Sequence, residues 1–427
     1  MAGEIPTRGS MQIVFLSTLS LTYASFIGRV FPLTRALRRM GHDVQIVTLH
    51  HNWPGRPFTD VVYGEVPIHY VGPMHVHGLG DARRQLRGAA LLWAAAVATV
   101  QLARYTLHLP ADLYHIWKPH PFNGLAGLTA ARLRGRPVVV DCDDYEAMSS
   151  RFGSGAQQRV VRFFEDGLPK WAGAATANTH FWTERLVRTL GLPPERVAYI
   201  PNGVDPERFA APEPGVVERL RRELGLEGKA VVVYVGILSL TGHPLDLLLE
   251  AFAQVAEAMP RAHLLWVGGG EDGSALRQRA AELGLSTRMT FAGVVPPEAV
   301  VAYYRLGNCA VDPVRDDVHA RARCPLKVLE SMACGVPVVT GDVGDRRELL
   351  GDGQAGLLVQ PGDAAALATG IQTLLTDPQR QRALGKTALR EVERYHWDRL
   401  AGEVEEFYQQ LLGGPLNRSV RGACREQ

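Results

Sequence analysis

Lys327 and Glu330, three residues apart, are the side chains of this 427-residue chain whose spacing best suits a chemical task. Pro325 can open a helix at its first helical position, so both side chains would project from one face of the first turns. Gly335 then ends the helix, and residues 336–340 form a short buried strand. A helix N-terminus attracts phosphate, and a carboxylate one turn inside it accepts hydrogen bonds from a ribose diol. The pattern predicts a nucleotide-diphosphate site, although an exposed ion pair on an ordinary helix has the same spacing.

The elements that must position this segment alternate between strand and helix. Residues 12–17 form the first expected strand, a helix follows from about 26 to 40, and residues 44–48 form the second strand. This order builds parallel sheets, so the expected fold class is α/β with two doubly wound, Rossmann-like domains. The other expected strands are residues 112–116, 137–141, 174–177, 197–200, 230–235, 263–267 and 289–295.

Composition limits the size and the partners of the protein. With 427 residues, 46% of them hydrophobic, the chain can bury two proper cores. A formal net charge of +2 gives no indication of nucleic-acid binding. Five cysteines without a C-x-x-C pair favour a reduced, cytoplasmic compartment. Residues 1–10 contain no apolar signal core, and translation could begin at Met11.

The run P-L-K-V-L-E-S-M-A-C-G-V-P-V-V at 325–339 resembles the donor-binding segment of family-4-type glycosyltransferases. L-R-R-M-G-H-D-V-Q-I-V-T at 37–48 and I-P-N-G-V-D-P-E-R-F at 200–209 resemble the same family, so the similarity covers most of the chain. Such enzymes have the GT-B fold and transfer a sugar from a nucleotide diphosphate with retention of the anomeric configuration. The resemblance implies an N-terminal acceptor domain at 11–205, a linker at 206–229, a donor domain at 230–395, a crossover helix at 396–412 and a tail at 413–427.

The resemblance also assigns roles to residues. Glu330 would hold the donor ribose, and Arg323 and Lys327 would bind the diphosphate. Gly28 and Arg29 fall in the first loop, on the acceptor side of the expected cleft. The remaining donor-side positions are Gly236, His243, Gly269, Gly270 and Glu271, where the glycines would let the backbone approach the donor.

The chain departs from the family pattern in the second half. The arginine and lysine that bind the diphosphate in the family are replaced by Ile237 and His243. The first glutamate of the family's pair, which contacts the donor sugar, is replaced by Ala322. The missing positive charge would have to come from helix N-termini together with Arg321, Arg323 or Lys327.

The loop after the expected strand at 112–116 also departs from the pattern. Trp117 stands where the family has a histidine that touches the sugar, and His120 is assigned to this role as catalytic residue instead. A metal alternative comes from the next strand, because Asp141, Asp143, Asp144 and Glu146 include an Asp-x-Asp that could hold Mg²⁺. Relatives generally need no metal, so we expect no cofactor beyond the nucleotide-sugar substrate and place these carboxylates at the acceptor cleft.

Gly268, Gly270 and Gly273 form a G-x-G-x-x-G run after a strand. A dinucleotide site would also need an acidic residue at the end of the next strand, about 20 residues on. The strand at 289–295 contains none. The sequence therefore disfavours binding of NAD.

An uncharged stretch at 89–103 has Arg83, Arg84 and Arg87 before it and Arg104 after it. It looks too short to span a bilayer. Two interpretations remain open: a helix packed on the sheet, which we favour, or peripheral membrane contact through residues 83–104 at the inner face of the membrane.

The expected activity is transfer of a sugar from a nucleotide sugar to a glycan or lipid-linked acceptor. Two alternatives stay open. One is a sugar-nucleotide epimerase of the same fold, and the other is a catalytically silent subunit that binds nucleotide sugar, as the losses at Ile237, His243 and Ala322 would suggest.

Overall fold

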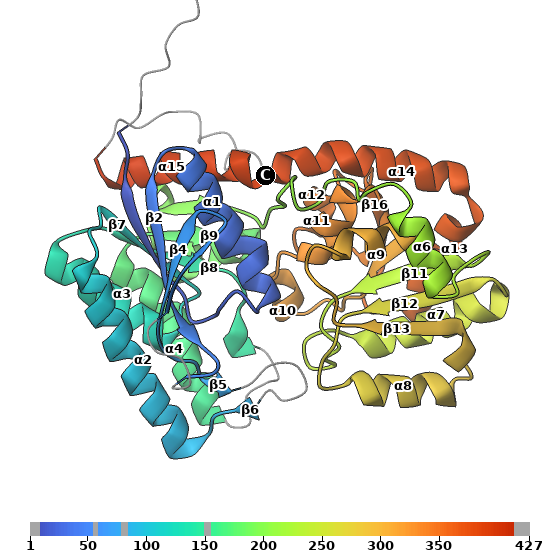
Figure 1. The fold of residues 1–427 in the computed structure, drawn as a ribbon, viewed down its shortest axis with the longest axis horizontal. Helices are drawn as coiled ribbons and strands as arrows, with labels where there is room; N and C mark the ends of the chain where they lie inside the picture. Colours follow the sequence, from blue (N-terminus) through green and yellow to red (C-terminus); the bar gives the residue numbers. More distant parts are fainter. Residues whose placement is uncertain (1–8, 54–58, 78–83, 149–154, 414–427) are drawn as a thin grey trace, which may run out of the picture.

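The computed structural model describes residues 9–53, 59–77, 84–148 and 155–413. Two large sheets lie side by side, each between layers of helices (Figure 1). The expected α/β class with two doubly wound domains is confirmed. The expected tail lies outside the described residues except for Gly413.

The first sheet has eight strands in the order β10-β9-β8-β7-β1-β2-β4-β3. All neighbouring strands are parallel except β3 and β4, which form an antiparallel edge that the sequence analysis did not predict. The other strands match the predicted ones to within two residues. The bounds are β1 Gln12–Leu16, β2 Asp43–His50, β3 Thr59–Tyr63, β4 Val66–Pro73, β7 Leu113–Trp117, β8 Val138–Cys142, β9 Ala175–Ala177 and β10 Val197–Tyr199.

Helices cover both faces of this sheet, and each face has its own apolar core. One face is packed by α2 Gly88–His108, α3 Pro121–Arg134, α4 Gly155–Ala172 and α5 His180–Glu184. The other face is packed by α1 Phe31–Arg39 and by the last helix of the chain, α15 Trp397–Leu411. Smaller elements are η1 Phe26–Val30, the hairpin strands β5 Val76–His77 and β6 Arg84–Gln85, η3 Glu146–Met148, η4 Arg185–Thr189 and η5 Pro194–Arg196.

The second sheet is entirely parallel, with six strands in the order β13-β12-β11-β14-β15-β16. Its strands are β11 Ala230–Val235, β12 Ala262–Val267, β13 Met289–Gly293, β14 Cys309–Asp312, β15 Val338–Gly341 and β16 Gly356–Val359. Its helices are α6 Val216–Glu223, α7 Leu245–Ala258, α8 Gly273–Glu282, η6 Ser286–Arg288, α9 Val300–Leu306, α10 Val318–Arg321, α11 Leu326–Ala333, α12 Arg346–Leu349, α13 Ala364–Thr376, α14 Pro378–Glu391 and η7 Val392–Tyr395. Ligands of such sheets bind at the carboxyl ends of the strands.

The last helix crosses back onto the first domain, as predicted. Figure 1 shows α14 and α15 end to end along one side of both domains. Trp397 and Leu400 are 2% exposed and belong to the core under the first sheet. The Trp397 indole donates to the carbonyl oxygen of Gly28 at 3.2 Å, and the Tyr408 hydroxyl lies 2.6 Å from Nδ1 of His115 in β7. The first domain is therefore completed by residues that follow the second in the chain.

Three local expectations were wrong. Pro325 lies at the N-cap of α11 with extended backbone, one residue before the helix begins. Trp117 is the last residue of β7 and is buried, because the sheet extends one residue further than predicted. The apolar helix α2 is 21 residues long, which is sufficient by length to cross a bilayer, because the helix continues past Arg104 to His108.

Candidate active site

The expected donor-side residues gather where strands of the second sheet end. The loop 236–244 follows β11, and the loop 268–272 follows β12. The backbone N–H of Leu238 donates to the carbonyl oxygen of Gly269 at 3.0 Å, so the two loops lie backbone against backbone. A β-carbon on Gly270 would lie 2.4 Å from the Leu238 carbonyl oxygen. Contact between the loops therefore requires Gly270 to be glycine before any ligand is considered.

Gly236 and Glu271 belong to the same junction of loops. A β-carbon on Gly236 would lie 3.4 Å from Cε of Lys327, so the lysine side chain passes directly beside this glycine. Glu271 accepts a hydrogen bond from the Ser239 hydroxyl at 2.7 Å. Glu271, which was predicted to lie on the donor side, therefore also stabilises the loop that carries His243.

A group of basic side chains meets beside these loops. The Arg323 guanidinium and the Lys327 ammonium each have a nitrogen 3.4 Å from Nδ1 of His243. Arg323 also donates to the Gly242 carbonyl oxygen at 2.9 Å and contacts Nε2 of His319. We call these four side chains, His243, His319, Arg323 and Lys327, the cation cluster, after the guanidinium and ammonium groups that donate to the two imidazole rings. It lies at the loop in which the family's arginine and lysine are missing.

A buried carboxylate supports the cluster from the sheet. Asp312, at the end of β14, lies 3.4 Å from Nζ of Lys327 and 2.8 Å from Nε of Arg346. Although burial alone would raise the pKa of Asp312, the Arg346 guanidinium and Lys327 hold it well below its usual value. Burial lowers the pKa of Lys327, with Asp312 opposing this effect and Arg323 adding to it. An anion that approaches Lys327 would favour its charged form further.

Glu330 lies one turn along α11 from Lys327. It accepts a hydrogen bond from the Tyr304 hydroxyl at 3.0 Å, and a guanidinium nitrogen of Arg208 lies 3.6 Å from its other oxygen. Burial raises the pKa of Glu330, while Arg208 opposes the rise. The pocket beside the carboxylate, lined from both domains, holds about 10 Å³, whereas ligand pockets usually hold about 300–1,000 Å³. A nucleoside would not fit into this pocket unless neighbouring parts moved.

The carboxylates after β8 converge on a buried lysine. Nζ of Lys118 lies 2.7 Å from Asp144, 3.5 Å from Glu146 and 3.6 Å from Asp143. Burial alone would lower the pKa of Lys118, but the three carboxylates hold it well above its usual value. Asp144 also lies 3.3 Å from Nε of Arg323, so an acid of the first domain reaches the cation cluster of the second. The ammonium group lies among three of the four carboxylates considered for Mg²⁺, whereas the fourth, Asp141, pairs with Arg29. The described residues contain no group of three or more potential ligands arranged for a metal ion.

His120 lies at the N-cap of α3, on the same side of the first domain as this acidic group. Its ring stacks on that of His75 with centroids 6.4 Å apart. Burial lowers the pKa of His120, while Glu146 raises it and Lys118 lowers it further. The ring is therefore neutral near pH 7 and can accept or donate one hydrogen bond. Its contact with sugar or acceptor stays a prediction.

The acceptor-side assignment of Arg29 was wrong. Arg29 is 1% exposed and forms two hydrogen bonds of 2.7 Å with Asp141. Its other donors bind the carbonyl oxygens of residues 200 and 201 and the side chain of Asn202. All five N–H donors are thus used inside the protein, because the strand ends of β8 and β10 converge on this side chain. Gly28 is also interior, beside Leu326 and Trp397.

The three positions that depart from the family pattern have different environments. Ala322 is fully buried and packs into the core of the first domain, so the larger glutamate would not fit in this arrangement. Ile237 is 44% exposed beside the cation cluster and adds no charge. Arg321 forms a paired ion contact with Asp316 at the surface, so it does not supply the missing charge.

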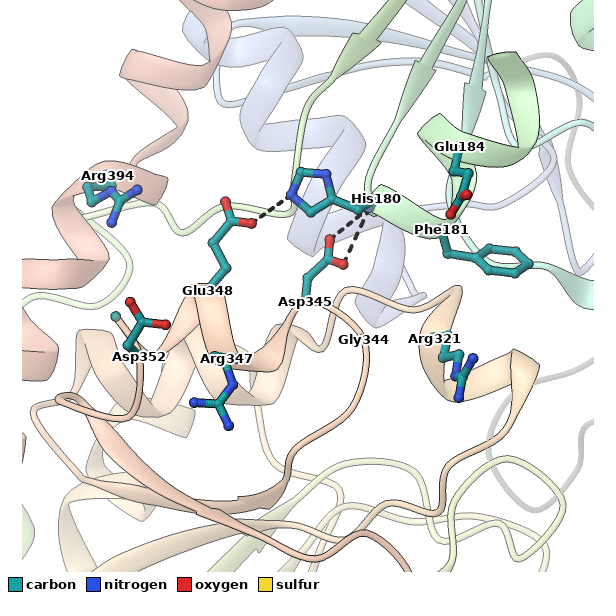
Figure 2. Close-up of a pocket in the computed structure, with 11 residues that line it drawn as sticks. His180, Phe181, Glu184, Arg321, Gly344, Asp345, Arg347, Glu348, Asp352 and Arg394 are labelled. Carbon is teal, nitrogen blue, oxygen red and sulfur yellow. Dashed lines mark hydrogen bonds and ion pairs between the residues drawn. The ribbon is translucent and has the colours of Figure 1, made fainter. Parts of the chain in front are cut away.

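A larger cavity, of about 580 Å³, lies between the domains at the loop that follows β15 (Figure 2). His180 of the first domain reaches across it, with its ring 2.6 Å from Glu348 and its backbone N–H 3.0 Å from Asp345. The lining also includes Arg321, Arg347 and Arg394. The size and position of this cavity suit a ligand, but none of the expected donor-side residues lines it.

Several residues of the site were not predicted. Arg208, Tyr304 and Asp312 contact the predicted Glu330 and Lys327, and Lys118 gathers the acidic group. Arg208 could have been identified from the sequence, because it lies within the I-P-N-G-V-D-P-E-R-F motif. The others are single residues of strands, helices or loops whose contacts depend on packing between distant segments.

Solved structures define the class of fold. Sucrose-phosphate synthase from Thermosynechococcus elongatus superposes with a TM-score of 0.74 at 22% sequence identity, over 94% of this chain and 99% of that one. A complex titled Anabaena Alr3699/HepE with UDP and glucose superposes with a TM-score of 0.70 at 20% identity, over 93% and 99% of the two chains. This is the GT-B fold, as the resemblance implied.

Sequence comparison gives the family. Residues 29–203 match the model of the glycosyl transferase 4-like domain, and residues 216–391 match that of glycosyl transferases group 1. A D-inositol 3-phosphate glycosyltransferase of Rhodococcus jostii is 32% identical over 424 residues, which cover 96% of this chain and 90% of that protein. Another, from Acidothermus cellulolyticus, is 34% identical over 253 residues, covering 56% and 54% of the two chains. The chain belongs to the family-4-type glycosyltransferases of the GT-B fold.

Proposed function

We propose that this glycosyltransferase takes its sugar from a nucleotide diphosphate and transfers it with retention of the anomeric configuration. The observation that carries the proposal is the cation cluster, which lies one helical turn from Glu330. Lys327 and Glu330 are held on one face of α11 by Asp312, Tyr304 and Arg208. The cations suit a diphosphate, and the carboxylate suits a ribose diol.

The main task of these residues is to stabilise charge. When the sugar leaves, negative charge develops on the diphosphate, and Arg323 and Lys327 are already positioned to stabilise it. Asp312 and Glu271 would keep the two loops and Lys327 in place, so little reorganisation is needed. His120 would contact the sugar or the acceptor from the first domain. The leaving phosphate would accept the acceptor's proton, which requires no protein nucleophile.

The acceptor that we propose is a glycan, a lipid-linked glycan or a small polyol. Relatives are named for D-inositol 3-phosphate, and one from Mycolicibacterium smegmatis is named a GDP-mannose-dependent mannosyltransferase acting on phosphatidylinositol monomannoside. Alr3699/HepE was solved with UDP-glucose. GDP-mannose and UDP-glucose are therefore the first donors to test.

A thermal-shift panel of UDP-, GDP- and ADP-sugars tests the donor site. A ligand that binds only the folded state raises the melting temperature. We expect one nucleotide class to give a shift in the wild type and in Glu257→Ala, a control at an exposed position on α7, but not in Glu330→Ala. If every donor left the melting temperature unchanged, the donor proposal would be wrong.

Release of nucleoside diphosphate with and without acceptor separates an active enzyme from a silent binding subunit. We expect release to depend on the acceptor, and proton NMR of the product to show the donor's anomeric configuration. Donor binding without release for any acceptor of the panel would favour the silent subunit, for which the replacements Ile237 and His243 are the structural argument. Interconversion of free nucleotide sugars would indicate the epimerase.

A further inference from the structure

Three helices on one face of the first sheet expose apolar side chains to solvent. α2 contacts α3, and α3 contacts α4, so they form one continuous layer. This layer carries eight of the eighteen large hydrophobic side chains that are exposed in the described residues. We call them the outer helical face: Leu92, Trp93, Val100, Leu125, Leu133, Val160, Phe163 and Trp171.

The helix α2 contributes most to this face. Its buried residues Ala94, Ala98, Leu102 and Thr106 recur every fourth position and face the sheet. The opposite side is also apolar, with Leu92 72% exposed and Trp93 58% exposed. A helix that is apolar all round is normally covered on every side. In the part of the chain that the structure describes, only one side of α2 is covered.

A cluster of aromatic rings extends the face onto α4. Phe163 and Trp171 lie edge to face with centroids 5.4 Å apart, and Phe163 contacts Phe164 at the same distance. The exposed Arg162 and Lys170 stand beside these rings in the sequence. Tryptophan next to cations is typical of protein surfaces that lie at the headgroup level of a membrane.

The charge around α2 indicates the partner. Residues 82–111 contain no aspartate and no glutamate. Arg84 and Arg87 are exposed before the helix, and Arg104 is exposed near its end. An acid from another element, the exposed Asp60 of β3, accepts a hydrogen bond from Tyr105 near the end of α2. Along the helix and the segment before it, apolar side chains bordered by arginines complement a surface that is apolar inside and negative outside.

We propose that the outer helical face docks on an anionic phospholipid bilayer, with α2 lying along the membrane surface. At about 31 Å, the helix is long enough to cross the hydrocarbon core. However, its buried side packs against β4 and α3, so crossing would remove a layer of the first domain's core. A second copy of the chain suits the face less well, because a symmetric contact through α2 would bring arginines against arginines.

The face is separate from the candidate donor site. Figure 1 shows α2 at the edge of the first domain that lies away from the second domain. None of the residues of the cation cluster, nor Glu330, is on α2, α3 or α4. Membrane docking can therefore be measured without nucleotide sugar, and its outcome is independent of the proposed function.

Co-sedimentation of the full chain with vesicles tests the proposal. We expect binding to vesicles of equal parts phosphatidylcholine and phosphatidylglycerol, and at least tenfold weaker partitioning with phosphatidylcholine alone. Leu92→Gln with Trp93→Gln should reduce partitioning at least tenfold. Arg84→Gln with Arg87→Gln should reduce it severalfold and make the remainder less sensitive to salt.

The matched control is Met40→Gln with Val62→Gln, which removes two exposed apolar side chains of the same domain outside the face. We expect partitioning like the wild type, and melting temperatures within about 1 °C of it for all variants, since exposed substitutions usually change stability little. Wild type that stays in solution with both vesicles would overturn the proposal. So would a concentration-dependent dimer that Leu92→Gln with Trp93→Gln dissolves, because the face would then be covered by a second copy.

Discussion

At the scale of single residues, the site consists of ionisable groups whose partners come from distant parts of the chain. Glu330 depends on Arg208, which lies between β10 and α6, and on Tyr304 of α9. Asp143 is buried with Lys118 3.6 Å away and accepts a hydrogen bond from the Asn178 amide. Buried groups of this kind have shifted pKa values, so single substitutions should change both affinity and the dependence on pH.

Arg208→Met is expected to weaken donor binding. Arg208 opposes the rise in the pKa of Glu330 that burial causes, so its loss raises that pKa further and favours the protonated carboxyl. We expect KM for the donor to rise about tenfold, equivalent to about 1.4 kcal/mol, and more steeply as the pH falls, with kcat little changed. Initial rates between pH 5.5 and 8.5 measure this. Arg219→Met on the exposed side of α6 is the control, and a lower KM in Arg208→Met would instead show that Arg208 competes with the ribose.

Asp143→Asn is expected to stabilise the protein at high pH only. Burial raises the pKa of Asp143 to about 6, against Lys118, which lowers it. The pKa of Asp143 is near 4 in the unfolded chain and about 6 in the folded protein. Between pH 4 and pH 6 the carboxyl group therefore ionises more readily in the unfolded chain, and the wild type loses stability as the pH rises through this window. The asparagine oxygen can still accept the hydrogen bond from Asn178. Denaturant unfolding should show that Asp143→Asn increases the free energy of unfolding by about 1–3 kcal/mol at pH 8 and leaves it unchanged at pH 4. An equal increase at both pH values would show that ionisation of Asp143 is not the cause.

At the scale of elements, the donor side depends on how two loops pack. The loop after β11 and the loop after β12 share backbone hydrogen bonds and the Ser239–Glu271 contact. Their packing positions His243, which contacts Arg323 and Lys327 of the α10–α11 segment. Loop packing thus explains two glycines of the G-x-G-x-x-G run, Gly268 and Gly270, because a β-carbon on either would lie within 2.5 Å of a backbone oxygen of the neighbouring loop.

Gly270→Ala and Gly273→Ala separate loop packing from other effects of glycine. A β-carbon at Gly270 would lie 2.4 Å from the Leu238 carbonyl oxygen, whereas one at Gly273 would lie 3.7 Å from its nearest neighbour. We expect Gly270→Ala to cost about 1–3 kcal/mol of stability and to weaken donor binding, because the loops must separate. Gly273→Ala should be neutral or slightly stabilising. Thermal unfolding and donor titration measure both, and equal effects at the two positions would exclude the steric explanation.

At the scale of the whole molecule, the two domains are held together in contact. α15 completes the core of the first domain, Asn202 donates to the Cys324 carbonyl oxygen at 2.8 Å, and Asp144 pairs with Arg323. The space at Glu330 is about 10 Å³ in this arrangement. A nucleoside that occupies this pocket would require the domains to open and then to close onto the ligand.

Asp144→Asn is expected to ease this opening. Asp144 holds Arg323 at 3.3 Å, and a diphosphate must replace the carboxylate at the guanidinium. We expect KM for the donor to fall by a factor of about 2–5, because a partly exposed ion pair contributes up to about 1 kcal/mol and the donor would no longer have to break this one. Asp166→Asn, which breaks a pair with Arg185 inside the first domain, is the control. A rise in KM would show that Asp144 itself contributes to the donor site.

The α/β class, most strands and the α11 segment with Lys327 and Glu330 could be predicted from the sequence alone. These features are local, because strand periodicity, helix ends and glycine turns depend on neighbours in the chain. Three features could be read from the folded chain alone: Arg29 is interior, Lys118 lies among the acids after β8, and His243 contacts Arg323. The tertiary structure also decided that one side of α2 stays uncovered. Such contacts join residues far apart in the chain, for example 112 positions for Arg29 and Asp141 and 173 for Arg29 and Asn202, and packing of the sheets and domains creates them.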